Sequence, residues 1–125
     1  CEWIKSEFTY DPFASNSLTN ASKTMDNRRG VCRDYAHVLI AMLRASSIPA
    51  RIVSAYSVGV NPPDFHAVVE VYLDRGWVLI DPTGMATTED IICIGVGRDA
   101  TDVSFLTSFG LVDFQSQTVA VEKLD

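Results

Sequence analysis

A chain of 125 residues, of which 47% are apolar and 21% charged, is long enough for one folded domain and too short for two ordinary ones. The formal net charge is −6 and the ten basic residues are scattered, which argues against a nucleic acid or an anionic membrane as the main partner. No stretch approaches the roughly 18 consecutive apolar residues of a membrane-spanning helix. Because the chain opens on Cys1 within a helix-like pattern, we interpret residues 1–125 as a single domain that belongs to a longer protein.

The N-terminal third of the chain predicts helices and a loop. Residues 1–8 fit the end of a helix, and residues 11–20 are rich in Asn, Ser and Thr, which is typical of a loop. Thr19 or Asn20 can cap a short helix that runs through Met25.

The clearest helical pattern follows this short helix. Tyr35, Val38 and Leu39 recur at helical spacing. The residue before a proline is restricted to extended backbone, so the helix must stop before Pro49. The sequence therefore predicts a long helix over residues 32–45.

The remainder of the chain is typical of strands. Segments of high β-propensity, separated by turn residues, predict strands at 51–58, 66–73, 77–81, 91–96 and 118–123. Helices come first and a mostly antiparallel sheet follows, which is the α+β pattern.

Three cysteines are odd in number and too few for a disulfide scaffold. Cys93 lies in an apolar run, where we expect it to be buried as a small hydrophobic residue. Cys1 has no role that the sequence indicates. Cys32 opens the predicted long helix, two residues after Gly30, which lets the backbone turn sharply and leaves the sulfur approachable.

The position of Cys32 favours a reactive thiolate. Free backbone N–H groups and the helix dipole stabilise negative charge at a helix N-terminus, and the thiolate is the nucleophilic form of cysteine. The alternative is a buried structural cysteine on a core helix.

His66 and Asp81 complete a candidate constellation with Cys32. His66 starts a strand after the Pro-Pro-Asp loop, and histidine suits proton transfer at neutral pH. If residues 66–73 pair with 77–81 in a hairpin, Asp81 lies near the His66 end and can fix the imidazole tautomer. Taken singly, such a histidine is more often structural and an Asp before Pro is usually a turn former.

Four sequence blocks, in this order and separation, resemble the bacterial transglutaminase-like superfamily, in the branch whose members are named as candidate cysteine proteases. A fifth, later block resembles the tail motif of that branch. The blocks are GVCRDYA (30–36), IPAR (48–51), HAVVEV (66–71), GWVLIDPT (76–83) and GRDATDV (97–103).

The resemblance implies a papain-like α+β fold with the nucleophile helix packed on the sheet. It implies Cys32 as nucleophile, His66 as base and acid, and Asp81 as orienting carboxylate, with a thioester formed from an amide or peptide carbonyl. Water or an amine then takes the acyl group, so the implied activity is that of a protease, an amidase or a transglutaminase. One departure is Val68, which stands where the family usually has Trp and makes the cleft wall and substrate preference open questions.

No metal or cofactor is expected. His37 lies five positions after Cys32 and about 140° away around the helix, so the two cannot share a metal, and we expect a surface or core histidine. A zinc site from Cys32, His66 and Cys93 lacks paired ligand spacing.

Five further residues have weaker expected roles. Asp34, Arg98 and Asp99 can form a structural ion pair beside the site. Trp77 and Tyr56 are expected in the core rather than in contact with substrate.

Three classes of function remain open. The first is a Cys–His–Asp enzyme acting on a peptide or protein substrate, with hydrolysis favoured over transfer to an amine acceptor. The second is another thiol acyltransferase with the same residues, such as an arylamine acetyltransferase. The third is a non-catalytic interaction domain of the same fold. The cellular compartment is not indicated by the sequence.

Overall fold

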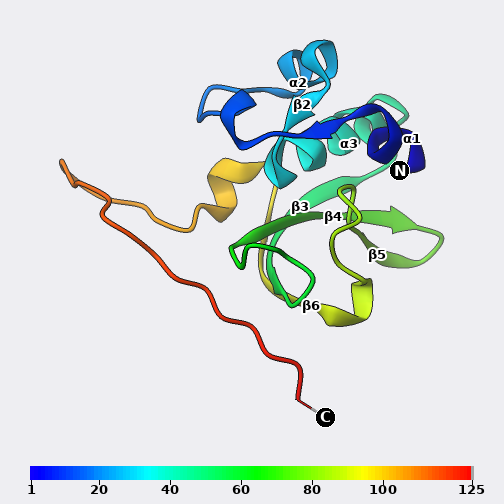
Figure 1. Ribbon diagram of the computed structural model, residues 1–125. Coiled ribbons are helices and arrows are strands. Elements are labelled where there is room, and N and C mark those ends of the chain that lie inside the picture. Colours follow the sequence, from blue (N-terminus) through cyan, green and yellow to red (C-terminus); the bar gives the residue numbers. More distant parts are fainter. Residues whose placement is uncertain (125) are drawn as a thin grey trace.

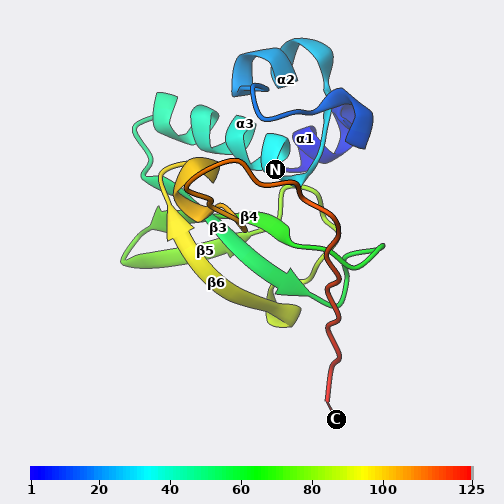
Figure 2. The same ribbon diagram turned by 90° about the vertical axis from the view of Figure 1, so that its left-hand side faces the viewer.

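The computed structural model describes residues 1–124 and shows three helices on one face of a four-stranded sheet (Figures 1 and 2). The helices are α1 (Glu2–Glu7), α2 (Ala21–Asn27) and α3 (Cys32–Ala45). The sheet contains β3 (Ala50–Ser57), β4 (His66–Leu73), β5 (Gly76–Ile80) and β6 (Ile91–Gly97). The smaller elements are β1 (Thr9–Tyr10), β2 (Arg29–Gly30), η1 (Pro12–Ala14), η2 (Thr88–Asp90) and η3 (Ala100–Val103).

The four-stranded sheet is antiparallel throughout, with the order β5-β4-β3-β6. The hairpin of β4 and β5 sets Leu73 opposite Gly76 and Val69 opposite Ile80. Strands β1 and β2 form a separate parallel pair. The predicted α+β class is therefore confirmed, as are the long helix and the strand over residues 66–73.

Helix α3 is held on the sheet by its apolar face. Val38 and Leu39 are buried against Ile52 of β3 and Val69 of β4, neither of which is exposed to solvent. Apolar residues at helical spacing lie on one face of the helix, and alternate strand residues lie on one face of the sheet. These two faces pack together and form the core. This packing fixes the start of α3, where Cys32 lies, relative to the first residue of β4.

Helix α2 begins where its sequence predicts. The side chain of Asn20 accepts a hydrogen bond from the backbone N–H of Lys23 at 3.0 Å, which satisfies one free donor of the first turn. The helix ends at Asn27, and the next residue, Arg28, adopts the left-handed conformation.

The predicted strand over residues 118–123 is wrong. Residues 104–124 form no helix or strand, and their apolar side chains are largely exposed. High β-propensity alone does not make a strand, because the backbone needs a neighbour that completes the ladder of hydrogen bonds. In the structure this segment lies outside the sheet and pairs with none of its strands (Figure 2), while Gln117 and Lys123 bind Asp64 and Asp90.

The expectation for Cys93 is also wrong, because β6 is an edge strand. Cys93 is exposed, as are Ile92, Ile94 and Val96 of the same strand. An apolar run is buried only where both faces of a strand are covered, which is not so for β6. Within residues 1–124, no helix is long and apolar enough to cross a bilayer.

Candidate active site

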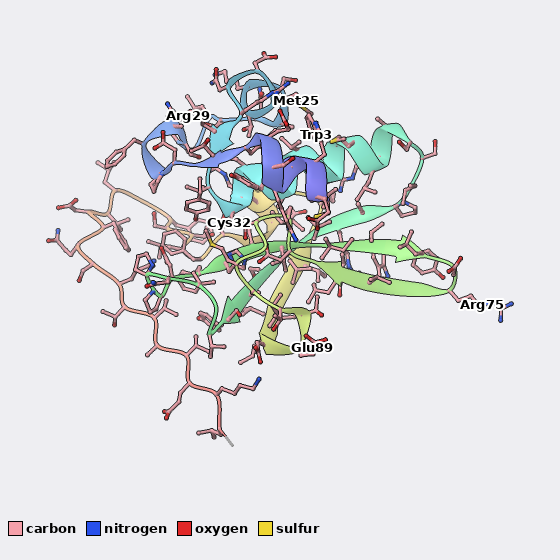
Figure 3. All side chains as sticks on the ribbon, turned by 45° about the vertical axis from the view of Figure 1, so that its right-hand side comes forward. Trp3, Met25, Arg29, Cys32, Arg75 and Glu89 are labelled. Atoms are coloured by element: carbon pink, nitrogen blue, oxygen red, sulfur yellow. The ribbon has the colours of Figure 1, made fainter. Side chains whose placement is uncertain are left out.

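Cys32 is the first residue of α3 and lies where that helix meets the sheet (Figure 3). The residue before it, Val31, has extended backbone and its N–H donates to Asp34 Oδ2 at 2.9 Å. Asp34 is itself buried and brings a negative charge to the first turn, which stabilises the helix start. Cys32 is half-buried and therefore partly accessible to solvent.

Gly30 is required here for space rather than for a sharp turn. A Cβ atom at this position would lie 2.6 Å from Asp34 Oδ2 and 2.7 Å from Asp34 Cβ. The backbone of Gly30 can therefore pack directly against Asp34, which sets the position of Cys32 two residues later. The sequence predicted that Gly30 permits a sharp turn, but its role in the structure is to let the Asp34 side chain approach the backbone closely.

His66 and Asp81 meet as the hairpin register predicts. His66 Nε2 lies 2.8 Å from Asp81 Oδ2, and both side chains are almost fully buried. Strand β4 begins at His66, and Asp81 is the residue that directly follows β5. Pairing of the two strands places both side chains at the same end of the hairpin.

Asp81 is fixed by neighbours besides His66. Its Oδ1 accepts hydrogen bonds from the N–H and the hydroxyl of Thr83, at 2.9 and 2.7 Å. Its Oδ2 also accepts from the N–H of Ala86 at 2.9 Å. Burial raises the pKa of Asp81, but the hydrogen bond and charge of His66, with the bonds from Thr83 and Ala86, lower the pKa overall.

The second ring nitrogen of His66, Nδ1, is not engaged by Asp81. Nδ1 is buried and has no hydrogen-bond partner among the residues that the structure describes. Burial lowers the pKa of His66, whereas Asp81 and a nearby Cys32 thiolate raise it, to about 9 overall. The three predicted residues are thus brought together, since Asp81 binds His66, and His66 and Cys32 line the same cavity.

Tyr10 is a neighbour of Cys32 that sequence reasoning missed. Strand β1 pairs with β2 and sets Tyr10 opposite Gly30, two residues before the cysteine. Burial, followed by the negative charge of a Cys32 thiolate, raises the pKa of Tyr10 to about 12, while the backbone N–H of Cys32 opposes the rise. Tyr10 therefore lies close to Cys32. A Tyr-Asp-Pro sequence alone gives no sign of this contact.

The expected ion pair among Asp34, Arg98 and Asp99 is wrong. Arg98 Nε binds Asp102 Oδ2 at 2.9 Å, and Asp34 Oδ1 binds Arg33 at 3.0 Å. The side chain of Asp99 accepts from the N–H of Thr101 and caps η3.

The two aromatic residues assigned to the core have other positions. The Trp77 side chain is 41% exposed and the Arg51 guanidinium stacks over its ring at 4.0 Å. Tyr56 is half-buried and lines a cavity that also contains Cys32 and His66. Conversely, Val68 is fully buried with Val53 and Ala55 and does not line that cavity.

His37 is half-buried, and its Nε2 accepts the backbone N–H of Ala100 at 3.1 Å. Burial, with the charge of Arg33 next, lowers the pKa of His37. This contact joins α3 to η3, which is a structural role. Over the described part of the chain, no group of three or more His, Cys, Asp and Glu side chains could hold a metal ion.

Comparison with known proteins identifies the family. Residues 1–82, which include Cys32, His66 and Asp81, match the sequence profile of the transglutaminase-like superfamily. The chain belongs to this superfamily.

The relatives give the family context. The crystal structure of a candidate cysteine protease from Cytophaga hutchinsonii is 43% identical, with a TM-score of 0.79 over 82% of this chain and 35% of its own. An uncharacterised Mycobacterium leprae protein is 35% identical over 82% of this chain and 39% of its own length. A protein-glutamine gamma-glutamyltransferase from Pseudomonas aeruginosa is 34% identical over 67% of this chain and 15% of its own length. The chain thus spans well under half of each of these relatives.

Proposed function

We propose that the chain is the catalytic part of a thiol enzyme that transfers acyl groups from amide or peptide carbonyls. The observation that carries the proposal is the buried His66, held by Asp81 at 2.8 Å, with Nδ1 left unpartnered beside Cys32 within the described residues. A histidine fixed on one side by a carboxylate and open on the other to a thiol is the arrangement that nucleophilic catalysis requires.

Acylation follows from these positions. The Cys32 sulfur attacks the carbonyl carbon and forms a C–S bond, while His66 holds the thiol proton as imidazolium. That proton passes to the leaving nitrogen as the C–N bond breaks, which releases an amine and leaves a thioester. Asp81 stays ionised, fixes the ring tautomer and stabilises the imidazolium charge.

The negative charge that develops on the carbonyl oxygen needs donors, and two groups are available. One is the first backbone N–H of α3, that of Cys32, which the helix dipole reinforces. The other is the hydroxyl of Tyr10, a residue that lies close to Cys32 through the pairing of β1 with β2. We assign both groups to the oxyanion site.

Deacylation decides the class of enzyme. Water activated by His66 attacks the thioester and breaks the C–S bond, giving a carboxylic acid and free Cys32; an amine would give a new amide instead. Relatives carry names of both kinds, a candidate cysteine protease and a protein-glutamine gamma-glutamyltransferase. We assign water as the acceptor, because no acidic side chain lines the cavity at Cys32 among the described residues.

The test is intact-protein mass spectrometry of the chain after incubation with a peptide library, with and without added amines. We expect an acyl adduct on Cys32 in wild type, none in Cys32→Ala, and release of acids rather than new amides. Amide products in the presence of amines would make the chain a transglutaminase. An acetyl adduct formed only from an acetyl-carrying cofactor would indicate an arylamine-acetyltransferase type of reaction, and no adduct from any donor would make it a binding domain.

A further inference from the structure

The cavity at Cys32 is large and mostly apolar. Its volume is about 590 Å³, within the roughly 300–1,000 Å³ of small-molecule sites in proteins. Cys32 and His66 occupy one part of its lining. The rest of the lining is dominated by apolar and aromatic side chains, namely Ile52, Tyr56, Phe65, Ile94, Phe105 and Leu106.

Three aromatic rings form a continuous surface in this lining. The rings of Tyr56 and Phe65 have centroids 5.3 Å apart at 30°, and those of Phe65 and Phe105 are 5.4 Å apart at 23°. Phe65 is the residue directly before His66, so this surface begins at the proposed base. A row of neighbouring aromatic rings suits another aromatic or a large aliphatic side chain.

The charged groups of the lining also favour an apolar side chain over a cation. Among the described residues of the lining, Arg33 is the one permanent charge. Its Nη2 binds Asp34 at 3.0 Å, Ser15 at 2.8 Å and the carbonyl oxygen of Asn16 at 2.6 Å, whereas its buried Nε has no partner among these residues. A lysine side chain or polyamine that entered the cavity would lose its hydration and meet no carboxylate in return. An apolar side chain meets no such penalty.

We infer that this cavity is a specificity pocket that takes an aromatic or large aliphatic side chain of the acyl donor, at the residue whose carbonyl Cys32 attacks. The inference rests on the proposed function, because the pocket has this meaning only if Cys32 is the nucleophile. Phe65 and Ile94 are the specificity-determining residues. The cation of lysine is a poor match to this lining, and the carboxamide side chain of glutamine would bury less apolar surface against the aromatic rings than an aromatic side chain does.

Peptidyl chloromethyl ketones test the pocket directly, with Phe, Gln or Lys as the residue that carries the reactive group. Iodoacetamide, which needs no pocket, supplies the reference rate of Cys32 alkylation. Relative to iodoacetamide, we expect the Phe reagent to label Cys32 at least about tenfold faster than the Gln or Lys reagent, since burial of apolar surface favours it.

Two variants sharpen the test. Phe65→Ser should remove the preference for the Phe reagent, and Ile94→Asp should raise labelling by the Lys reagent by about tenfold or more. Ile94 is 50% exposed on an edge strand, so a carboxylate is tolerated there. Trp77→Ser, on a strand that does not line the cavity, is the control and should change neither ratio.

Each outcome bears on one of the two claims. Equal labelling by the three peptide reagents, with Cys32 still the fastest thiol towards iodoacetamide, overturns the pocket and leaves the proposed function standing. Faster iodoacetamide labelling of Cys93 than of Cys32 overturns the proposed function and the pocket with it. An unchanged reagent ratio in both Phe65→Ser and Ile94→Asp also overturns the pocket.

Discussion

The cavity at Cys32 has two walls that are held in very different ways. The inner wall contains Ile52 and His66, which are 0% and 2% exposed and belong to the sheet beneath α3. The outer wall contains Ile94, Phe105 and Leu106, which are half exposed and belong to an edge strand and to a segment without regular structure. The proposed base, His66, lies on the buried inner wall, whereas the proposed specificity-determining residue Ile94 lies on the exposed outer wall.

This contrast has a physical reason. Proton transfer requires groups fixed to a fraction of an ångström, which buried strands with paired backbones provide. Substrate side chains differ in shape, and an exposed wall with few packing partners can adjust to them. Substitutions at the inner wall should therefore affect turnover and stability much more than changes at the outer wall do.

The largest effect is expected at the sulfur. Cys32→Ala should abolish turnover, because no other group can form the thioester. The free energy of unfolding should change by no more than about 1–2 kcal/mol, since one atom is removed from a half-buried site. Thermal melts and product release measure both. Cys93→Ala, which removes an exposed thiol, is the control, and loss of turnover there would contradict the assignment.

Asp81→Asn should lower turnover by several orders of magnitude, on the order of 10⁴-fold by analogy with the serine protease triad. The amide presents the wrong partner to the imidazole and no longer stabilises the imidazolium. The substitution also leaves part of a buried hydrogen-bond network unsatisfied, so a loss of about 1–3 kcal/mol in stability is expected. Product release and thermal melts on the same sample measure the two effects.

Asp99→Asn is the matched control for this change. Asp99 Oδ1 accepts the N–H of Thr101 at 2.9 Å, just as Asp81 Oδ1 accepts that of Thr83, but Asp99 has no histidine among its described partners. The control should keep full turnover. If Asp81→Asn behaves like Asp99→Asn, and Cys32 still reacts with iodoacetamide at the wild-type rate, Asp81 is only a turn residue.

Tyr10→Phe should reduce turnover by about 10²–10³-fold, the usual effect of losing one oxyanion donor. Alkylation of Cys32 by iodoacetamide should stay within a few fold of wild type, because that reaction forms no oxyanion. Tyr72→Phe, an exposed ring that packs on Trp77, is the control. If alkylation and turnover fall together, Tyr10 acts by orienting the thiol instead.

The features that could be predicted from the sequence are those that depend on neighbouring residues. Cys32–Ala45 and His66–Leu73 were predicted with their observed bounds, because helical spacing and β-propensity depend on neighbouring residues and Pro49 marks a boundary. The meeting of His66 and Asp81 followed from hairpin register. Tyr10 was missed because its contact with Cys32 arises from the pairing of β1 with β2, which are distant in sequence.

The wrong predictions of burial also arise from contacts between residues that are distant in sequence. Cys93 and Trp77 lie in segments whose composition is that of buried strands, but β6 and β5 are the two edges of the sheet. Whether a strand is central or at an edge is decided by topology, which one sequence pattern does not reveal. The predicted strand at 118–123 failed for want of a partner strand, again a non-local property.

The inner wall should also respond to pH. Because the pKa of His66 is raised to about 9 in the folded chain, its protonated form contributes stability that is fully present below about pH 6.5 and is lost as the pH rises through about 9. The difference in unfolding free energy between wild type and His66→Asn, measured by urea titration, should shrink by on the order of 1–3 kcal/mol over that interval. A constant difference across that whole interval would show that His66 is neutral in the fold.

The smallest effect is expected from the outer wall. Ending the chain at Leu106 keeps Phe105 but removes the hydrogen bond of Gln117 to Asp64, the ion pair of Lys123 with Asp90 and the contact of Phe114 with Phe105. Phe109 and Leu111 are fully exposed, so little apolar surface is lost from the core. The free energy of unfolding should therefore change by about 1 kcal/mol or less.

Val69→Ala, at a fully buried position of the inner sheet, should cost about 2 kcal/mol by comparison. Iodoacetamide should label Cys32 of the shortened chain at the wild-type rate, because no group of the inner wall is altered. A loss of stability as large as that of Val69→Ala would show that the segment after Leu106 is part of the folded core, and the two walls would then not differ in the way proposed.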